Sequence, residues 1–496
     1  MRPAYYREQW EQIKPSPSAE DLKSLSQRVA SAFVDRYFYS DEYNQEYIQL
    51  LCEMATSNAE PELNQLAAKS LFGIVIERLC DDFEELQTET YNRLISQVAG
   101  YLRALPQGQQ LDERLQRFHL HSEDQLYQRV EAMRLTPDSV LPADIEPRKI
   151  LILSRVTIGA DVAVTSVICQ RLAQAFPQAE LVVLGNDKLR QIMTPASGIR
   201  IRELHYARHG GLVERFNTWL DLVADVEAEL QGLSANEYLV FDPDSRLTQL
   251  GVLPLVADRN YRFFNSRGKQ GYPVKGSISA LCNTWLNNVL GDNNFNYPRV
   301  WLNEACLNTA ASLRQQLCQH PAHRLITLNL GVGGNQRKRV AGDFEADLVL
   351  SLLQESNTTV ILDMGFGDEE QQRSTYILDA ARKQGITTHT TAFDSLTQVP
   401  PHTALLGVEC NVGEIGALIS HSDEFIGYDS ACQHIGAALG IPTYTIFAGT
   451  SNARFIRRWH ASGPNTSEIV YVDTLSREHE IDTVELIQRL HELRRE

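Results

Sequence analysis

The spacing of apolar residues divides the chain into a first part with helical periodicity and a longer part in which strands and helices alternate. The first part covers residues 1–145. A capping pattern begins at Ser18, and apolar side chains follow every three or four residues, at Leu22, Leu25 and Val29. This spacing places them on one face of a helix, which indicates a helix with one buried side.

A second helical pattern covers residues 61–105, and we interpret its acidic run at 81–85 as a solvated helix face. No stretch in this part has the pattern of a strand. We therefore predict an all-α N-terminal domain over residues 1–145. Two roles are open for this domain: it binds a protein partner, or it packs on the domain that follows.

After a proline-punctuated joint at 140–147, short apolar runs alternate with helical patterns. We expect strands at residues 149–154, 181–185, 238–242, 325–330 and 359–363. A helix is expected from about Val162 to Phe176, and residues 258–300 are expected to be a loop with one helix at 278–290. Such alternation indicates right-handed βαβ units and parallel sheets. The predicted fold class is α/β, with two Rossmann-like doubly wound domains at 146–320 and 321–496.

The stretch 424–450 reads as strand, tight turn, helix and strand. The turn leaves free N–H groups near Ser430 and Ala431, and the start of a helix is a natural seat for a phosphate group. His434 follows Ser430 by one helical turn, so it either contacts that phosphate or packs against its own helix.

Two further loops follow strands of the same predicted sheet. The glycine-rich loop at 331–339 carries Lys338 and Arg339, and the loop at 365–370 carries Asp368 and Glu369. Cations and a helix start could hold a diphosphate, and a carboxylate could hold ribose hydroxyls. The alternative for the basic loop is a solvated turn. Neither a phosphate-binding Gly-Lys-Ser/Thr motif nor a complete dinucleotide fingerprint is present.

Asp161 stands after the first strand of the first sheet, just past Gly159. A carboxylate there could remove a proton from an acceptor hydroxyl, or it could cap the helix expected to start at Val162. The pair Asp242 and Asp244 is interpreted as a turn rather than a metal site.

The formal charge of −17 argues against a protein that coats nucleic acid. Eight scattered cysteines without a C-x-x-C pair fit reduced thiols, and the chain starts without an apolar signal-peptide core. Apolar runs are far shorter than the roughly 18 residues of a membrane span. We therefore expect a cytoplasmic protein.

Residues from about 149 to 475 resemble glycosyltransferase family 9, the heptosyltransferase-like enzymes of GT-B fold. The resemblance is carried by GYDSACQH at 427–434 with AALGIP at 437–442, by LNLG at 328–331 with Lys338 and Arg339, and by IGAD at 158–161. The sequence differs from the family pattern in having Ala160 between the glycine and the aspartate, and Ala431 in place of a glycine.

The resemblance implies a metal-independent, inverting transferase that moves a sugar from a nucleotide diphosphate sugar to a hydroxyl of a glycan or glycolipid, with no cofactor. Asp161 would be the base. The expected donor-binding residues are Asn329, Gly331, Lys338, Arg339, Asp368, Glu369, Asp429, Ser430, Ala431 and His434. A glycolipid acceptor would bring the protein to a membrane surface. The alternative is a GT-B-shaped protein that binds nucleotide or a partner without catalysis.

Overall fold

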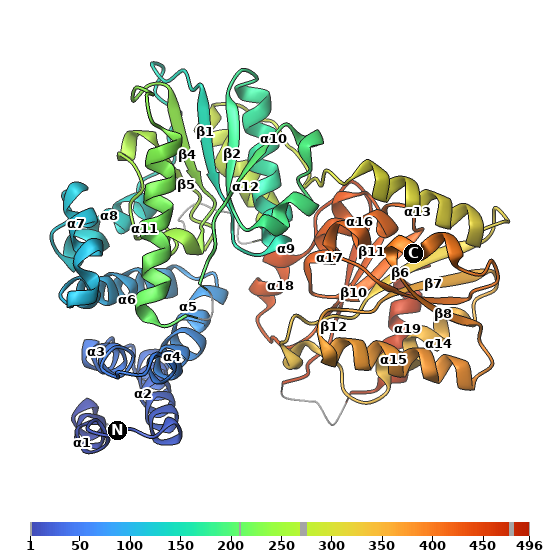
Figure 1. Cartoon of the computed structure of the whole chain (residues 1–496), viewed down its shortest axis with the longest axis horizontal. Helices are drawn as coiled ribbons and strands as arrows, with labels where there is room; N and C mark the ends of the chain where they lie inside the picture. The colour runs from blue at the N-terminus through green and yellow to red at the C-terminus, as the bar shows by residue number, and fades with distance from the viewer. Residues whose placement is uncertain (1, 208–209, 268–274, 476–480, 496) are drawn as a thin grey trace.

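The computed structural model describes residues 2–207, 210–267, 275–475 and 481–495. Figure 1 shows three parts: a helical region that contains the N-terminus, a first α/β domain beside it, and a second α/β domain that contains the C-terminus. The structure thus has two parallel-sheet domains after a helical region, which confirms the predicted fold class.

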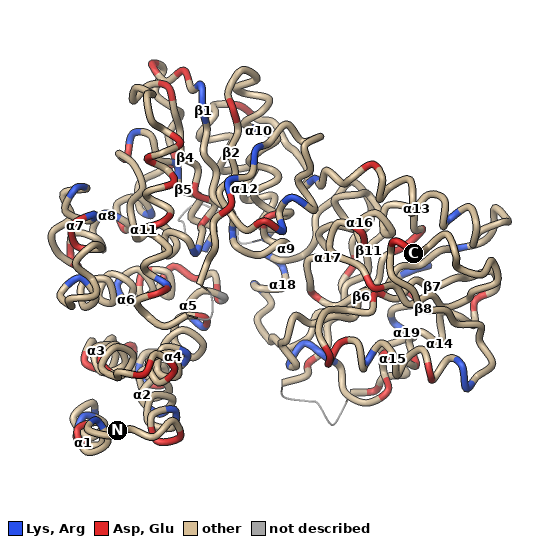
Figure 2. The backbone as a smooth tube through the Cα atoms, viewed as in Figure 1, with Lys and Arg blue, Asp and Glu red and all other residues tan. Residues whose placement is uncertain are grey.

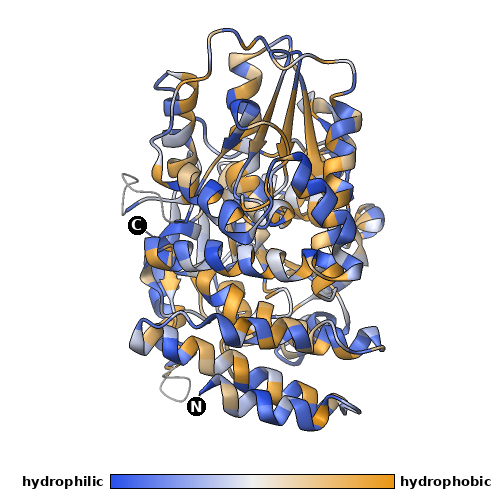
Figure 3. Cartoon of the chain, turned by 90° about the vertical axis from the view of Figure 1, so that its left-hand side faces the viewer, coloured by the Kyte–Doolittle hydropathy of each residue, from blue (hydrophilic) through white to orange (hydrophobic). Residues whose placement is uncertain are grey.

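The helical region consists of amphipathic helices, whose alternating apolar and polar faces are visible in Figure 3. Ser18 begins the second helix as predicted, because its side chain accepts the N–H of Asp21 at 3.0 Å. The helices and helical turns are α1 (Pro3–Ile13), α2 (Ala19–Ser40), α3 (Gln45–Met54), α4 (Pro61–Ser70), η1 (Leu71–Ile76), α5 (Glu77–Asp81), α6 (Glu85–Arg103), η2 (Pro106–Gly108), α7 (Gln109–Arg117) and α8 (Glu123–Leu135).

The acidic run at 81–85 is not a solvated helix face, so that interpretation is wrong. The helical path breaks between α5 and α6, where Phe83 adopts a positive φ of 53°. The Phe83 side chain is buried, with 5% of its surface exposed. Its ring packs toward Phe455 and Trp459, at centroid distances of 6.4 and 6.5 Å. An apolar contact with a distant part of the chain therefore overrides the local helical pattern.

The first sheet has the strand order β3-β2-β1-β4-β5, with every pair parallel. Its strands are β1 (Lys149–Leu153), β2 (Glu180–Gly185), β3 (Arg200–Glu203), β4 (Tyr238–Asp242) and β5 (Tyr261–Phe263). Its helices and helical turns are α9 (Ile158–Ala160), η3 (Asp161–Thr165), α10 (Ser166–Ala175), η4 (Asp187–Gln191), η5 (Pro195–Ser197), α11 (Leu212–Glu229), η6 (Arg246–Thr248), η7 (Asp258–Asn260) and α12 (Ile278–Leu290). The order reverses between β1 and β4, and ligands of such sheets bind outside the carboxyl ends of the strands at that point.

The central strand β1 is apolar along its length because both of its faces are covered. Leu151 and Leu153 face a core that continues into the helical region, whereas Ile150 and Ile152 face the core shared with α10 and α12. The segment 258–300 is more than a loop with one helix, because residues 261–263 form β5 at the sheet edge. Three residues are too few to show a strand pattern in sequence.

The second sheet has the order β12-β11-β10-β6-β7-β9-β8 and is also parallel. Its strands are β6 (Arg324–Asn329), β7 (Thr358–Asp363), β8 (Thr388–Ala392), β9 (Leu405–Glu409), β10 (Glu424–Tyr428), β11 (Thr443–Phe447) and β12 (Ser467–Tyr471). Its helices and helical turns are α13 (Glu304–Leu317), η8 (Gln336–Lys338), α14 (Phe344–Leu353), α15 (Asp368–Lys383), η9 (Phe393–Gln398), α16 (Val412–Ser420), α17 (Ala431–Ala438), α18 (Ala453–Trp459) and α19 (Thr483–Leu493).

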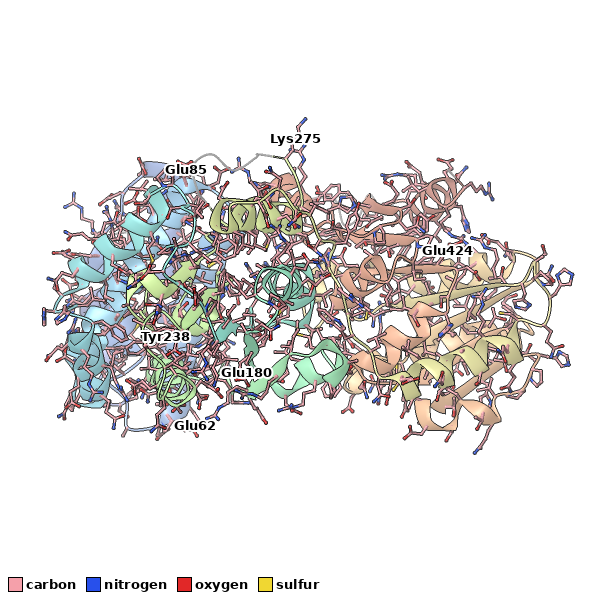
Figure 4. All side chains as sticks on the ribbon, turned by 90° about the horizontal axis from the view of Figure 1, so that it is seen from above. Glu62, Glu85, Glu180, Tyr238, Lys275 and Glu424 are labelled. Carbon is pink, nitrogen blue, oxygen red and sulfur yellow. The ribbon has the colours of Figure 1, made fainter. Side chains whose placement is uncertain are left out.

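Two ion pairs fasten the first and last helices of the second domain to its sheet. Arg314 of α13 contacts Asp423 at 2.9 Å, just before β10. Arg494, which follows α19, contacts Glu424 at 2.6 Å; Figure 4 labels Glu424 in this domain. α13 therefore packs on the second sheet, although it precedes residue 321 in the chain. In the described part of the chain, no helix has both the length and the apolar character to cross a membrane.

Candidate active site

An ion pair joins the basic loop to the end of β10. The Lys338 ammonium lies 2.6 Å from Oδ2 of Asp429 and also donates to the Asp429 carbonyl at 3.1 Å. The other carboxylate oxygen of Asp429 accepts from the Gln433 amide at 2.6 Å. The Lys338 side chain remains 25% exposed. The cation is therefore held in place and is still accessible to a ligand.

A chain of hydrogen bonds links the carboxyl ends of β10, β6 and β7. Ser430 begins α17 by accepting the N–H of Cys432, and its hydroxyl donates to Oδ1 of the Asn329 side chain at 3.3 Å. The Asn329 amide in turn donates to Asp363 at 2.6 Å. Burial raises the pKa of the Asp363 carboxyl above its usual value. These residues form a rigid polar floor under the edge of the sheet where the strand order reverses.

Glu370 organises two loops, and sequence reasoning did not single it out. Its carboxylate accepts N–H groups from Val332 at 3.0 Å and Gly333 at 3.3 Å in the glycine-rich loop. It also accepts the N–H of Phe366 at 2.9 Å in the next loop. Gly331 passes so close that an added Cβ would lie 3.0 Å from this carboxylate. The only sequence signal was its place in the acidic first turn of α15.

The other predicted donor residues are less closely grouped. Asp368 and Glu369 are exposed at the start of α15, where Glu369 accepts from the Gln336 amide of the basic loop. Arg339 lies 2.5 Å from Glu345 in a pair whose side chains are 7% and 5% exposed. Arg339 is therefore directed into the protein, whereas Lys338 pairs with Asp429 and remains partly exposed.

The first domain contacts the start of α17 directly. An added Cβ on Gly159 would lie 3.1 Å from the Ala431 Cα and 3.2 Å from Cδ2 of His434. The predicted phosphate seat is thus in direct contact with α9 of the first domain. The absence of a side chain at Gly159 is what lets the two helices approach.

His434 is buried beside this contact, with 4% of its surface exposed. Its ring lies 6.0 Å from the Trp459 ring in an edge-on arrangement. Burial lowers the pKa of the His434 imidazole to about 4. Its Nδ1 atom has no hydrogen-bond partner among the described residues. A neutral imidazole with an unused ring nitrogen is suited to exchange a hydrogen bond with a ligand.

Asp161 lies in the crevice wall of the first domain and is 1% exposed. One carboxylate oxygen accepts from the Ser154 hydroxyl at 2.7 Å, and the other accepts from the Arg155 N–H and the Thr165 hydroxyl, both at 2.7 Å. Burial raises the pKa of the Asp161 carboxyl to about 6. The alternative role as a cap of a helix starting at Val162 is wrong, because the helix begins at Ile158.

Asp242 and Asp244 form a tight turn, as expected. Asp242 accepts the N–H of Ser245 at 2.7 Å, and Asp244 accepts from Ser266 and pairs with Arg267. Over the residues that the structure describes, no group of three or more His, Cys, Asp and Glu side chains is arranged to hold a metal ion.

Residues 349–483 match the family model described as glycosyltransferase family 9 (heptosyltransferase), which confirms the resemblance for this part of the second domain. Lipopolysaccharide heptosyltransferase 3 of Escherichia coli is 47% identical over 62 residues, or 12% of this chain and 18% of the relative. The chain therefore aligns with less than a fifth of the length of that curated relative.

Two solved structures are similar to this chain at low sequence identity. A glycosyltransferase family 9 protein of Veillonella parvula is 13% identical, with a TM-score of 0.46 and coverage of 69% of this chain and 90% of that one. The ADP-heptose lipopolysaccharide heptosyltransferase II of Escherichia coli is 14% identical, with a TM-score of 0.44 and coverage of 70% and 98%. Because both scores are below 0.5, the fold assignment rests on the sheet topology.

Proposed function

With residues 349–483 matching glycosyltransferase family 9, we propose that this protein transfers a sugar from a nucleotide diphosphate sugar to a hydroxyl group of a glycan or glycolipid. The observation that carries the proposal is the polar group at the carboxyl ends of β6 and β10, where Lys338, Asp429 and the unsatisfied His434 lie next to the start of α17. The local match to a lipopolysaccharide heptosyltransferase supports a heptose donor and a lipopolysaccharide acceptor.

The donor diphosphate binds between the basic loop and α17. Lys338 supplies a cation, and the N–H groups at Ser430 and Ala431 supply the positive end of a helix dipole. His434 is neutral at pH 7, because its pKa is near 4, and it donates or accepts one hydrogen bond. Since these groups stabilise a leaving diphosphate without a metal ion, the proposed reaction is metal-independent.

Further donor contacts come from the two loops held by Glu370. Asp368 or Glu369 at the start of α15 accepts the ribose hydroxyls, while Asn329 and Gly331 shape the floor beneath the nucleotide. Arg339 contributes indirectly, since its ion pair with Glu345 anchors the loop that carries Lys338.

Asp161 is the proposed base. A pKa of about 6 leaves its carboxyl mostly ionised at pH 7, so it can take the proton of the attacking hydroxyl. Attack from the face opposite the diphosphate inverts the anomeric carbon. A positioned base contributes about 10²–10⁴-fold to the rate.

The hydrogen bonding of Asp161 favours a second candidate. Both oxygens are already occupied by three donors, and the side chain is almost fully buried. In that case Asp161 holds the β1–α9 turn, and the protein binds nucleotide or a partner without catalysis.

The test is sugar transfer and donor binding by wild type, Asp161→Asn and Lys338→Ala, with a panel of nucleotide diphosphate sugars. We expect Asp161→Asn to lower kcat by about 10²–10⁴-fold with little change in donor affinity. We expect Lys338→Ala to weaken donor binding about tenfold, as for the loss of a charge-assisted hydrogen bond. Lys383→Ala, at the exposed end of α15, is the matched control.

Donor binding without turnover in the wild type would favour the non-catalytic alternative. Equal donor affinity in wild type and Lys338→Ala would show that the diphosphate binds elsewhere, and the proposed site would be wrong.

A further inference from the structure

A cavity of about 520 Å³ lies where the three parts of the molecule meet. Its walls come from α4, η1 and α5 of the helical region, from the loops after β1 and β4, and from α11. Gly333 of the glycine-rich loop and Trp459 of α18 complete it. The cavity therefore adjoins the donor loop, and Ala160, next to Asp161, also lines it.

The cavity is rich in positive charge, although the whole chain carries a formal charge of −17. Its acidic lining residues are Glu77 and Asp244, and Asp244 is engaged by an arginine at 3.1 Å. The carboxylates of Asp161 and Asp242 also attract the Arg155 guanidinium electrostatically. The cationic lining residues are Lys69, Arg155, Arg215, Arg246 and Arg267. Figure 2 shows Lys and Arg positions in the segments around α9, α11 and α18.

Three of these arginines lie against aromatic rings. The guanidinium carbon of Arg215 is 3.9 Å from the centre of the Phe72 ring, and that of Arg267 is 4.6 Å from the Tyr91 ring. Both rings come from the helical region. Arg155 lies 5.7 Å from the ring of Trp459 in the second domain. Stacking fixes the plane of each guanidinium. Some of the N–H groups already donate within the protein: Arg155 to the Pro243 carbonyl, Arg215 to the Gly210 carbonyl and Arg267 to Asp244.

Part of this hydrogen-bonding capacity is unused. Arg267 is 4% exposed, and its Nη1 atom has no partner among the described residues. Burial lowers the pKa of the Arg215 and Arg155 guanidinium groups below their usual values. Buried cations and an unsatisfied donor are costly unless an anion compensates them. The cavity is therefore preorganised for a negatively charged group.

We propose that this cavity binds an oxyanion of the acceptor, a phosphate or carboxylate group on the sugar that receives the transferred residue, between Arg155, Arg215 and Arg267. The helical region completes the site, because Phe72 and Tyr91 orient two of the three arginines. That the oxyanion belongs to the acceptor rests on the proposed function, whereas the binding of an oxyanion in this cavity does not. This assigns residues 1–145 a direct part in substrate recognition.

Calorimetric titration of the full chain with inorganic phosphate, at constant ionic strength in chloride, measures this binding, and acetate in a parallel series measures carboxylate binding. We expect Arg215→Gln to weaken phosphate binding about tenfold, the loss typical of a charge-assisted contact. Phe72→Leu keeps the charge and removes the ring, so a loss of several-fold is expected. Arg190→Gln, which removes an exposed arginine of the same domain, should change nothing.

Lys338→Ala separates the two proposals. If it loses nucleotide binding and keeps phosphate binding that depends on Arg215, both sites stand. If phosphate binding is lost with Lys338 and is unaffected by Arg215→Gln and Phe72→Leu, phosphate occupies the donor site and the inference is wrong. Phosphate binding that depends on Arg215 would support the inference even if no variant transferred sugar. Acetate binding equal to that of phosphate would identify a carboxylate-bearing acceptor.

Discussion

His434 shows how burial of one side chain couples the site to pH. Its pKa is about 4 in the folded protein and about 6.5 when exposed, so between these values the unfolded chain binds more protons. The free energy of unfolding must therefore fall as the pH decreases through this window. As the pH falls from 6.5 to 4.5, we expect the free energy of unfolding of the wild type to decrease by about 2 kcal/mol more than that of His434→Gln. Urea unfolding at each pH measures this difference.

The pKa of Asp161 is shifted in the opposite direction, so this residue should give stability the opposite dependence on pH. Its pKa of about 6 lies above the value of 3.8 for an exposed carboxyl, so the folded protein holds the proton more tightly. Its contribution to stability is present below pH 3.8 and decreases as the pH rises through 6. As the pH falls from 6.5 to 4.5, Asp161→Asn should therefore lose stability relative to wild type, whereas His434→Gln should gain it. Identical pH profiles for wild type and His434→Gln would mean that the imidazole is not buried in solution.

At the scale of elements, Glu370 couples two loops that approach the proposed nucleotide. Its carboxylate accepts three backbone N–H groups, and hydrogen bonds to a charged group contribute about 1.5–3 kcal/mol each. Glu370→Gln keeps the shape but removes the charge and one acceptor. We expect it to weaken nucleoside diphosphate binding about tenfold in calorimetric titration. Asp379→Asn, further along the exposed face of α15, is the control, and equal affinity in both variants would contradict the argument.

Several elements with a buried apolar run could be predicted closely from the sequence, although the buried strand β9 was not expected. β4 and α12 have the expected bounds, because their apolar pattern and their caps are local signals. The edge strands β3 and β8 were not expected, since half-exposed strands carry polar residues and are defined by their neighbours. The site was predictable as a set of loops at strand ends. The role of Glu370 was not, because three N–H groups from two loops converge on it only in the folded chain.

At the scale of the whole molecule, the helical region bridges the two α/β domains. It shares a core with the first sheet, and its break at Phe83 contacts α18 of the second domain. Arg454 of α18 donates to the Phe83 carbonyl at 2.8 Å and pairs with Glu84 at 2.9 Å. Trp459 of the same helix contacts both Phe83 and His434, so this contact joins the helical region to the second domain beside the proposed donor site.

Deletion of the Phe83 ring should loosen this bridge. A buried Phe→Ala change lowers the free energy of unfolding by about 3–5 kcal/mol. This loss is larger than the contribution of the surface polar contacts of Arg454. We expect Phe83→Ala to increase the radius of gyration in small-angle X-ray scattering and to weaken nucleotide binding, because the two domains separate. Tyr39→Ala removes an aromatic ring that is 85% exposed on α2, and it should leave both quantities unchanged. An unchanged radius of gyration in Phe83→Ala would show that the contact between α9 and α17 is sufficient to hold the domains together.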